Sequence, residues 1–209
     1  MKPAYNGVYM KRLNESDLDF LRELSSIGVG HAATALSQLI GRQVEMRVPK
    51  ISIVDLSSVP ELMGGSEKVV SGVYLQVLGD ARGGILLIFP DDSSRSLISL
   101  LLKRVDEPLS EMGASTLKEV GNILASAYLS VLGNMLGITL IPSIPSLAHD
   151  MVGAVVDIVL SDLGEIGDTA FVFETEFCDI TDDIKGHFFL LPDPDSIDVI
   201  MKAIRSKNG

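Results

Sequence analysis

Glu119 and Asn122 are the two polar side chains of this sequence whose types and spacing best suit joint chemistry. A carboxylate accepts hydrogen bonds and carries charge, whereas a carboxamide both donates and accepts them. Residues three apart project from one face of a helix, and the surrounding segment 115–136 is almost wholly apolar or small. Either the two side chains satisfy each other at the surface, or they act together on something outside the helix.

The same spacing occurs earlier in the chain, at a shift of 96 positions. Four landmarks recur at that one shift: Glu23 with Glu119, Ser26 with Asn122, Gly41 with Gly137, and Pro49 with Pro145. Later segments repeat at a slightly longer shift, as I-F-P-D-D-S at 88–93 and L-L-P-D-P-D at 190–195. We therefore interpret the sequence as an internal duplication.

Hydrophobic periodicity and turn residues divide each copy into a helix, strands and a second helix. Helices are predicted over 16–40, 90–104, 111–136 and 192–205. Strands are predicted over 44–54, 69–78, 84–89, 138–144, 151–160, 169–177 and 186–191. Gly41 is predicted to end the first long helix as a left-handed cap.

Two copies of helix, three strands and helix bury their apolar faces when they share one sheet. We expect an α/β fold of the α+β type, with a single domain over 1–209 made of repeat 1 at about 16–105 and repeat 2 at about 110–206. The domain is expected to have pseudo-twofold symmetry and a mostly antiparallel sheet. The two long helices would lie on that sheet and present equivalent faces.

Composition argues against several classes of function. A net charge of −11 with scattered Lys and Arg disfavours nucleic-acid binding, which needs clustered positive charge. No long apolar run lacks charges or breakers, so we expect no membrane span. The single cysteine, Cys178, and the lack of a secretion signal favour a cytoplasmic protein. The three histidines have no Cys or Glu at ligand spacing, so no metal site is expected.

The two spaced motifs resemble those of a known family, the CheC / CheX / FliY phosphatases of bacterial and archaeal chemotaxis. The family pattern is an acid or serine, then Glu, Asn and Pro, and it stands here as Ser115, Glu119, Asn122 and Pro145. The segments 27–36 and 79–88 also resemble CheC. CheX-like chains are shorter and FliY carries an extra flagellar-switch domain, so the resemblance is closest to CheC.

The resemblance implies a phosphatase that hydrolyses the aspartyl phosphate of a CheY-like response regulator. Asn122 would orient the attacking water, and Glu119 would pair with a lysine of the receiver domain and hold the docked helix in register. The magnesium ion and the phosphorylated aspartate would both belong to the receiver, so no cofactor of its own is expected for this chain.

The first copy departs from the pattern at Ser26, where the family has asparagine. Serine is shorter, and misplacement by about one bond length costs on the order of 100-fold in rate. We therefore expect one competent site, at Glu119 and Asn122, and one degenerate site at Glu23 and Ser26, either dead or able only to dock.

Two other functions remain open at this point. The chain could be a binding module that sequesters a CheD-like receptor deamidase with little catalysis. Asp150 falls in a segment that resembles the CheD-contacting region of the family, so it is a candidate partner residue. The chain could also be a phosphatase in a pathway other than chemotaxis.

Overall fold

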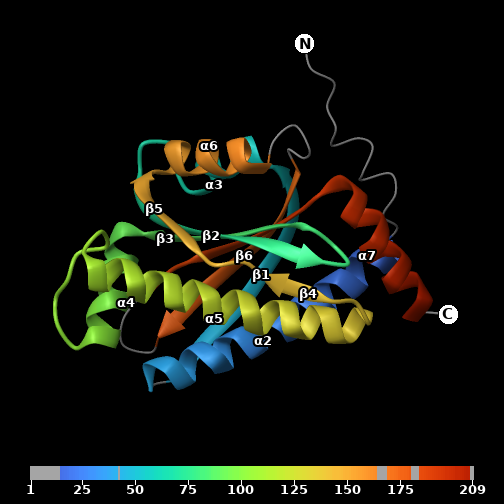
Figure 1. Ribbon diagram of the computed structural model, residues 1–209, viewed down its shortest axis with the longest axis horizontal. Coiled ribbons are helices and arrows are strands. Elements are labelled where there is room, and N and C mark those ends of the chain that lie inside the picture. Colours follow the sequence, from blue (N-terminus) through green and yellow to red (C-terminus); the bar gives the residue numbers. More distant parts are fainter. Residues whose placement is uncertain (1–14, 42, 164–168, 180–183, 208–209) are drawn as a thin grey trace, which may run out of the picture.

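The protein folds around one antiparallel sheet that is covered by helices on both faces (Figure 1). The computed structural model describes residues 15–41, 43–163, 169–179 and 184–207. One face carries α2 (Glu15–Ile40), α4 (Asp91–Leu102), α5 (Glu111–Leu136) and α7 (Pro194–Lys207). The other face carries the short α3 (Val59–Leu62) and α6 (Val152–Leu163). Two separate apolar cores therefore lie on the two sides of the sheet.

The strand order reveals the duplication. The strands are β1 (Val44–Asp55), β2 (Val69–Gly79), β3 (Gly83–Pro90), β4 (Leu140–Pro142), β5 (Ser146–Met151), β6 (Thr169–Asp179) and β7 (His187–Pro192). Their order is β1-β6-β7-β3-β2-β4, with β5 also paired to β2. β3 and β7 pair at the centre, and β1 of the first copy pairs with β6 of the second. The two copies therefore interlock across a pseudo-twofold axis, which confirms the predicted fold class.

The two long helices are equivalent in length and in position along the chain. α2 and α5 each have 26 residues, and both of their ends are offset by the shift of 96 positions found in the sequence. Gly41 and Gly137 follow them with φ of 72° and 71°, a left-handed conformation that glycine adopts without a Cβ clash. The predicted cap at Gly41 is confirmed by a hydrogen bond from its N–H to the Ser37 carbonyl at 2.9 Å.

The strand that follows each long helix is interrupted at the repeated proline. In β1 the register shifts between Arg47 and Lys50, where Pro49 lies. In the second copy the strand separates into β4 and β5, and Pro145 lies in the gap. Proline cannot donate to a strand ladder, so each proline disrupts pairing. Both prolines therefore have a structural role in interrupting the strand.

One predicted element is wrong. The segment 151–160 was expected to be a strand because it is rich in β-branched residues, which favour strands. It forms α6, whose buried residues are Val152, Val155, Val156 and Val159, the spacing of one helix face. The N–H groups of Val152 and Gly153 donate to the carbonyls of Lys68 and Ser66, respectively. These bonds satisfy two of the backbone donors that have no partner within the first turn of a helix. Burial against the underside of the sheet therefore overrides local strand preference.

The contact between α2 and α5 depends on a glycine facing an aromatic ring. A Cβ added at Gly28 would lie 2.7 Å from Cδ2 of Tyr128, so the two helices approach more closely there than any larger residue allows. Tyr128 is fully buried, and its ring lies 4.8 Å from that of Phe188, centroid to centroid. Its hydroxyl lies 3.5 Å from Oγ of Ser25 on α2.

The stability of this helix pair should depend on pH through Tyr128. Burial raises the pKa of Tyr128 to about 12, from 10.0 for an exposed tyrosine. The folded state therefore favours the neutral phenol. The resulting contribution to the free energy of unfolding is fully present below about pH 10 and is lost as the pH rises to about 12. We expect Tyr128→Phe to become more stable relative to the native sequence by about 1.4 kcal/mol per pH unit in this range. Denaturant titrations at about pH 9 and pH 11 measure the change, and a constant difference would contradict it.

Candidate functional site

Helix α5 holds Glu119 and Asn122 at the surface because its opposite side is fixed to the sheet. A Cβ added at Gly121 would lie 2.5 Å from Cγ1 of Val73 on β2, so the helix backbone rests directly on the strand. Val120 and Gly121 are buried, whereas Glu119 is exposed and Asn122 is half-buried. The three-residue spacing therefore places the carboxylate and the carboxamide together on the outward side of a rigid helix.

The two side chains are not used for internal structure. Within the part of the chain that the structure describes, neither Glu119 nor Asn122 has a side-chain hydrogen bond or an ion pair, including one to the other. Of the two possibilities raised by the sequence, a pair satisfied at the surface is therefore not what the structure contains. Both groups keep their full capacity to bind an external partner.

The first copy has the same environment but a different chemistry. Glu23 is exposed like Glu119, and the following residue, Leu24, is buried like Val120. Ser26 is exposed, and its hydroxyl donates to the carbonyl of Arg22 on its own helix at 2.9 Å. A hydroxyl bonded back to its own helix has no proton left for an external acceptor. The structure thus places Glu23 and Ser26 as the equivalent pair, with the serine engaged internally.

Asp150 lies away from both pairs, at the end of the edge strand β5. Its side chain is exposed, and its Oδ1 accepts a hydrogen bond from the N–H of Met151 at 2.7 Å. This contact stabilises the turn from β5 into α6. The carboxylate therefore has a local structural role, and its role toward a partner stays a prediction.

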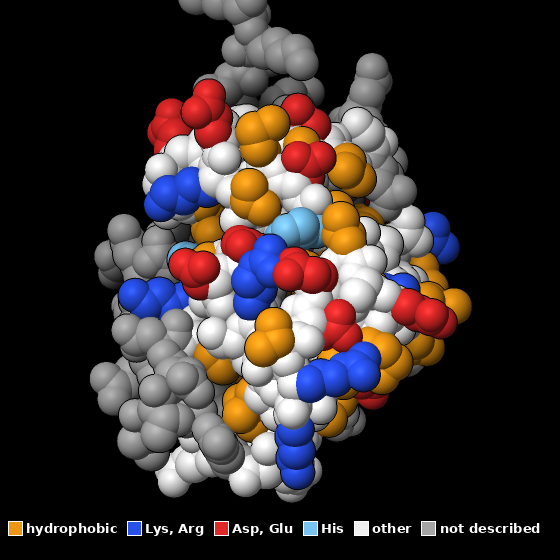
Figure 2. All heavy atoms as spheres, turned by 90° about the vertical axis from the view of Figure 1, so that its left-hand side faces the viewer, with side chains coloured by type: hydrophobic (Ala, Val, Ile, Leu, Met, Phe, Trp, Pro, Cys, Tyr) orange, Lys and Arg blue, Asp and Glu red, His pale blue; other side chains and the backbone are white. Residues whose placement is uncertain are grey.

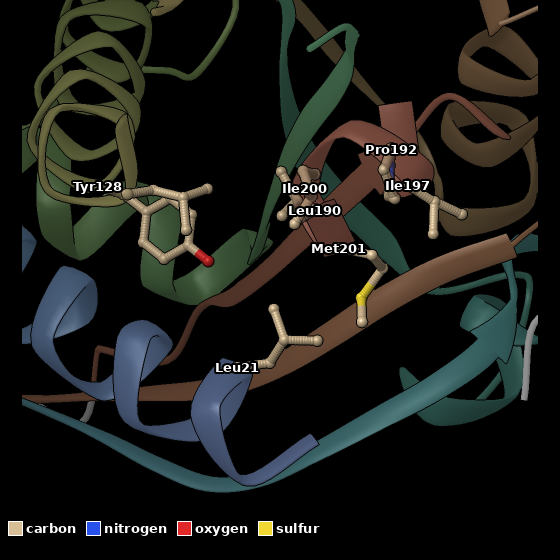
Figure 3. A pocket seen from close by; sticks show the side chains of 8 residues that line it. Leu21, Tyr128, Leu190, Pro192, Ile197, Ile200 and Met201 are labelled. Carbon is tan, nitrogen blue, oxygen red and sulfur yellow. The ribbon is translucent and has the colours of Figure 1, made fainter. Parts of the chain in front are cut away.

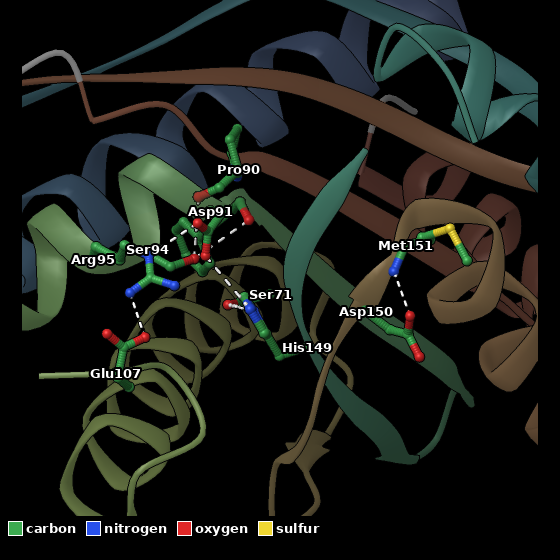
Figure 4. A network of polar contacts seen from close by, with 10 residues as sticks. Ser71, Pro90, Asp91, Ser94, Arg95, Glu107, His149, Asp150 and Met151 are labelled. Atoms are coloured by element: carbon green, nitrogen blue, oxygen red, sulfur yellow. Dashed lines mark hydrogen bonds and ion pairs between the residues drawn. The ribbon is translucent and has the colours of Figure 1, made fainter. Parts of the chain in front are cut away.

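A network of polar side chains that sequence reasoning missed lies beside β5 (Figure 4). Nδ1 of His149 lies 2.9 Å from Oγ of Ser71, and its Nε2 lies 3.4 Å from Oδ1 of Asp91. These residue types resemble a catalytic triad, but Ser71 is 0% exposed, so no substrate reaches its hydroxyl. The network is structural and joins β5 and β2 to α4. Nothing in the sequence indicates it, because pairing of β2 with β5 is what brings these residues together.

A pocket between α2, α5, α7 and β7 is almost entirely apolar (Figure 3). Its lining consists of Leu21, Tyr128, Leu132, Leu190, Pro192, Ile197, Ile200 and Met201. Neither Glu119 and Asn122 nor Glu23 and Ser26 contribute to it. The pocket has no group for acid–base or nucleophilic chemistry other than the buried phenol of Tyr128.

Among the described residues, no group of three or more His, Cys, Asp or Glu side chains could hold a metal ion. No helix in the described ranges combines the length and the apolar character needed to cross a membrane.

The sequence is similar to a phosphatase of chemotaxis. The model of the CheC-like family matches residues 18–53 and 112–149, which contain both copies of the motif. The CheY-P phosphatase CheC of Bacillus subtilis (strain 168) is 33% identical over 207 residues, which cover 96% of this chain and 97% of the relative.

Solved structures share the fold at lower sequence identity. FliY from Thermotoga maritima has a TM-score of 0.75 and 19% identity, with 93% of this chain and 98% of that chain covered. A chain of the CheX-CheY-BeF3-Mg2+ complex from Borrelia burgdorferi has a TM-score of 0.53 and 17% identity, with 80% and 96% covered. From the family match and the similarity to the Bacillus protein over nearly its whole length, the chain belongs to the CheC-like family.

Proposed function

We propose that this protein is a phosphatase that hydrolyses the aspartyl phosphate of a CheY-like receiver domain. The observation that carries the proposal is the outward pair of Glu119 and Asn122, which has no partner within the described chain. The Bacillus relative, a CheY-P phosphatase, supports the substrate class. The fold shared with a chain of a CheX-CheY complex is consistent with it.

For this reaction the catalyst mainly has to position the attacking water. An acyl phosphate is already reactive, and phosphoryl transfer proceeds mainly by in-line placement of the attacking group. The Asn122 carboxamide can accept a hydrogen bond from water with its oxygen and donate one with its nitrogen, which fixes the direction of attack. Glu119 would form a charge-assisted hydrogen bond with a lysine of the receiver and so set the register of the docked helix.

The shape of the site also favours a protein substrate. Glu119 and Asn122 project from a helix surface, outside the apolar pocket of Figure 3. A substrate bound there must supply its own cleft, into which the helix face fits. A receiver domain does so, since it holds its phosphorylated aspartate and the magnesium ion. In this proposal, all metal chemistry therefore belongs to the partner.

The proposal is tested by mixing the purified chain with phosphorylated CheY from Bacillus subtilis and following loss of the phosphate label. We expect faster loss than from the receiver alone, with the acceleration dependent on magnesium. An unchanged rate over a range of chain concentrations would overturn the assignment.

Replacing Ser26 by asparagine should activate the degenerate site. The substitution supplies a carboxamide at the position equivalent to Asn122 and removes a hydroxyl that is bonded to Arg22. Two independent sites would raise the rate at saturating receiver by up to about twofold, since each site then contributes separately. Steady-state dephosphorylation measures the gain, with Ser26→Ala as the control expected to match the native sequence. A loss of rate in Ser26→Ala would show instead that the serine is already active.

A CheD-like deamidase is a second candidate partner in this proposal. The supporting observation is the exposure of Asp150 beside the outer sheet edge, where a partner has access. Binding of a CheD homologue to Asp150→Ala, compared with the native chain, tests this role. The proposal places both partners in the cytoplasm, the compartment expected from the single cysteine.

A further inference from the structure

Three exposed apolar side chains lie in the segment that leads into α5 and in its first turn. Val105 is 88% exposed, Leu109 is 65% exposed and Met112 is 48% exposed. Single exposed apolar residues are common on protein surfaces and need no explanation. Three of them within residues 105–112 make this segment a candidate interaction site. Figure 2 shows this end of the molecule, where apolar side chains lie among acidic and basic ones.

The loop that carries two of these side chains is held in one conformation. We call residues 103–110, between α4 and α5, the docking loop. Nη2 of Arg104 lies 3.0 Å from Oδ2 of Asp106, whose Oδ1 accepts a hydrogen bond from the N–H of Glu107 at 2.9 Å. The N–H of Ser110 donates to the Glu107 carbonyl at 3.0 Å, and Oγ of Ser110 caps α5. The polar residues thus fold the loop and leave its apolar residues outside.

The loop is also tied to the body of the protein (Figure 4). Arg95 on α4 pairs with Asp91 at 2.9 Å and with Glu107 of the docking loop. Its hydrogen bonds to these two carboxylates raise the pKa of Arg95 further above its ordinary value, so its charge is retained. Asp91 in turn faces His149 on the edge strand β5. Exposed ion pairs are individually weak, but several linked ones restrict the loop.

Met112 lies on the same helix as the proposed catalytic pair. Met112 lies seven residues, or two helix turns, before Glu119, and so occupies the same side of α5. At about 1.5 Å per residue, the two side chains are roughly 10 Å apart along the helix. A specific interface buries about 800 Å² on each partner, which extends roughly 15 Å from its centre. A receiver seated on Glu119 and Asn122 would therefore also cover Met112, which follows the docking loop by two residues.

We propose that the docking loop and Met112 bind an apolar surface of the receiver domain beside its phosphorylation site. This inference rests on the proposed function. It identifies the side chains that give the protein its affinity for the receiver. In this proposal Asn122 orients the attacking water and Glu119 pairs with a lysine of the receiver, whereas Val105, Leu109 and Met112 supply apolar contact. Because the loop is already ordered, little conformational entropy is lost when the receiver binds.

The test removes the apolar contact without touching the catalytic pair. In Val105→Ser/Leu109→Ser we expect the KM for phosphorylated Bacillus subtilis CheY to rise about tenfold or more, with kcat unchanged, since a tenfold change corresponds to 1.4 kcal/mol. The matched control is Ile158→Ser, because Ile158 is 56% exposed on α6, on the opposite face of the sheet. The control should keep the native KM.

A binding measurement separates this inference from the proposed function. CheY carrying beryllium fluoride and magnesium serves as the probe, titrated against each variant. We expect weak binding by the double variant and native binding by Asn122→Ala, which lacks only the catalytic amide. If the double variant binds and turns over like the native chain while Asn122→Ala is inactive, the docking loop does not bind the receiver. The phosphatase assignment then stands. If the native chain does not accelerate dephosphorylation at all, both are refuted.

Discussion

Asn122→Ala should reduce the acceleration of receiver dephosphorylation by about 100-fold or more, because the variant loses the group that we propose orients the attacking water. The side chain is half-buried at the helix surface and has no internal hydrogen bond within the described chain, so its removal leaves no unsatisfied partner. The fold should therefore be intact. The degenerate site should not compensate, since the Ser26 hydroxyl is bonded to its own helix.

A second asparagine on the same helix gives a matched control. Asn134 is exposed on α5, so Asn134→Ala makes the same chemical change outside the proposed site. We expect Asn134→Ala to retain the native rate and both variants to have native thermal stability. Single-turnover loss of label from phosphorylated Bacillus subtilis CheY measures the rates. A native rate in Asn122→Ala would remove the basis of the proposed mechanism.

Gly28→Val should destabilise the protein by about 3 kcal/mol, the upper range for overpacking of a tight contact. Even the first added carbon would lie 2.7 Å from Cδ2 and 2.9 Å from Cε2 of Tyr128. The ring has little freedom to move, because it is buried and packed against Phe188. The two long helices must then separate, which exposes part of the larger core. For a chain of this size, the melting temperature should fall by roughly 6 to 12 °C.

Gly30→Val is the control for this prediction. Gly30 lies two residues further along α2, and a Cβ added there meets nothing within 4 Å. Valine and glycine are both poor helix formers, so the change should stay within about 0.5 kcal/mol. Thermal unfolding of both variants measures the difference. Equal melting temperatures would mean that the close approach of α2 and α5 is not a tight contact in solution.

Asn122 on α5 and the docking loop before α5 are expected to have different roles toward the receiver. The proposed role of the Asn122 amide is to orient the attacking water, so its loss should appear in kcat. Val105 and Leu109 lie on the docking loop and contact no reacting atom, so their loss should appear in KM.

Features that depend on local sequence could be predicted from the sequence alone. The shift of 96 positions, the lengths of α2 and α5 and the left-handed cap at Gly41 all agree with the structure. Glu119 and Asn122 could be placed on one helix face for the same reason, since a helix relates residues three apart without help from the rest of the chain.

Features that depend on contacts between distant segments were decided only by the tertiary structure. The valines of 152–163 suit a strand locally, and burial under the sheet makes them the inner face of α6. The network of Ser71, Asp91 and His149 exists only because β5 pairs with β2. Whether the Asn122 side chain points outward, with no partner among the described residues, was likewise set by how α5 packs on Val73. Periodicity describes one element at a time, whereas exposure depends on which other elements cover it.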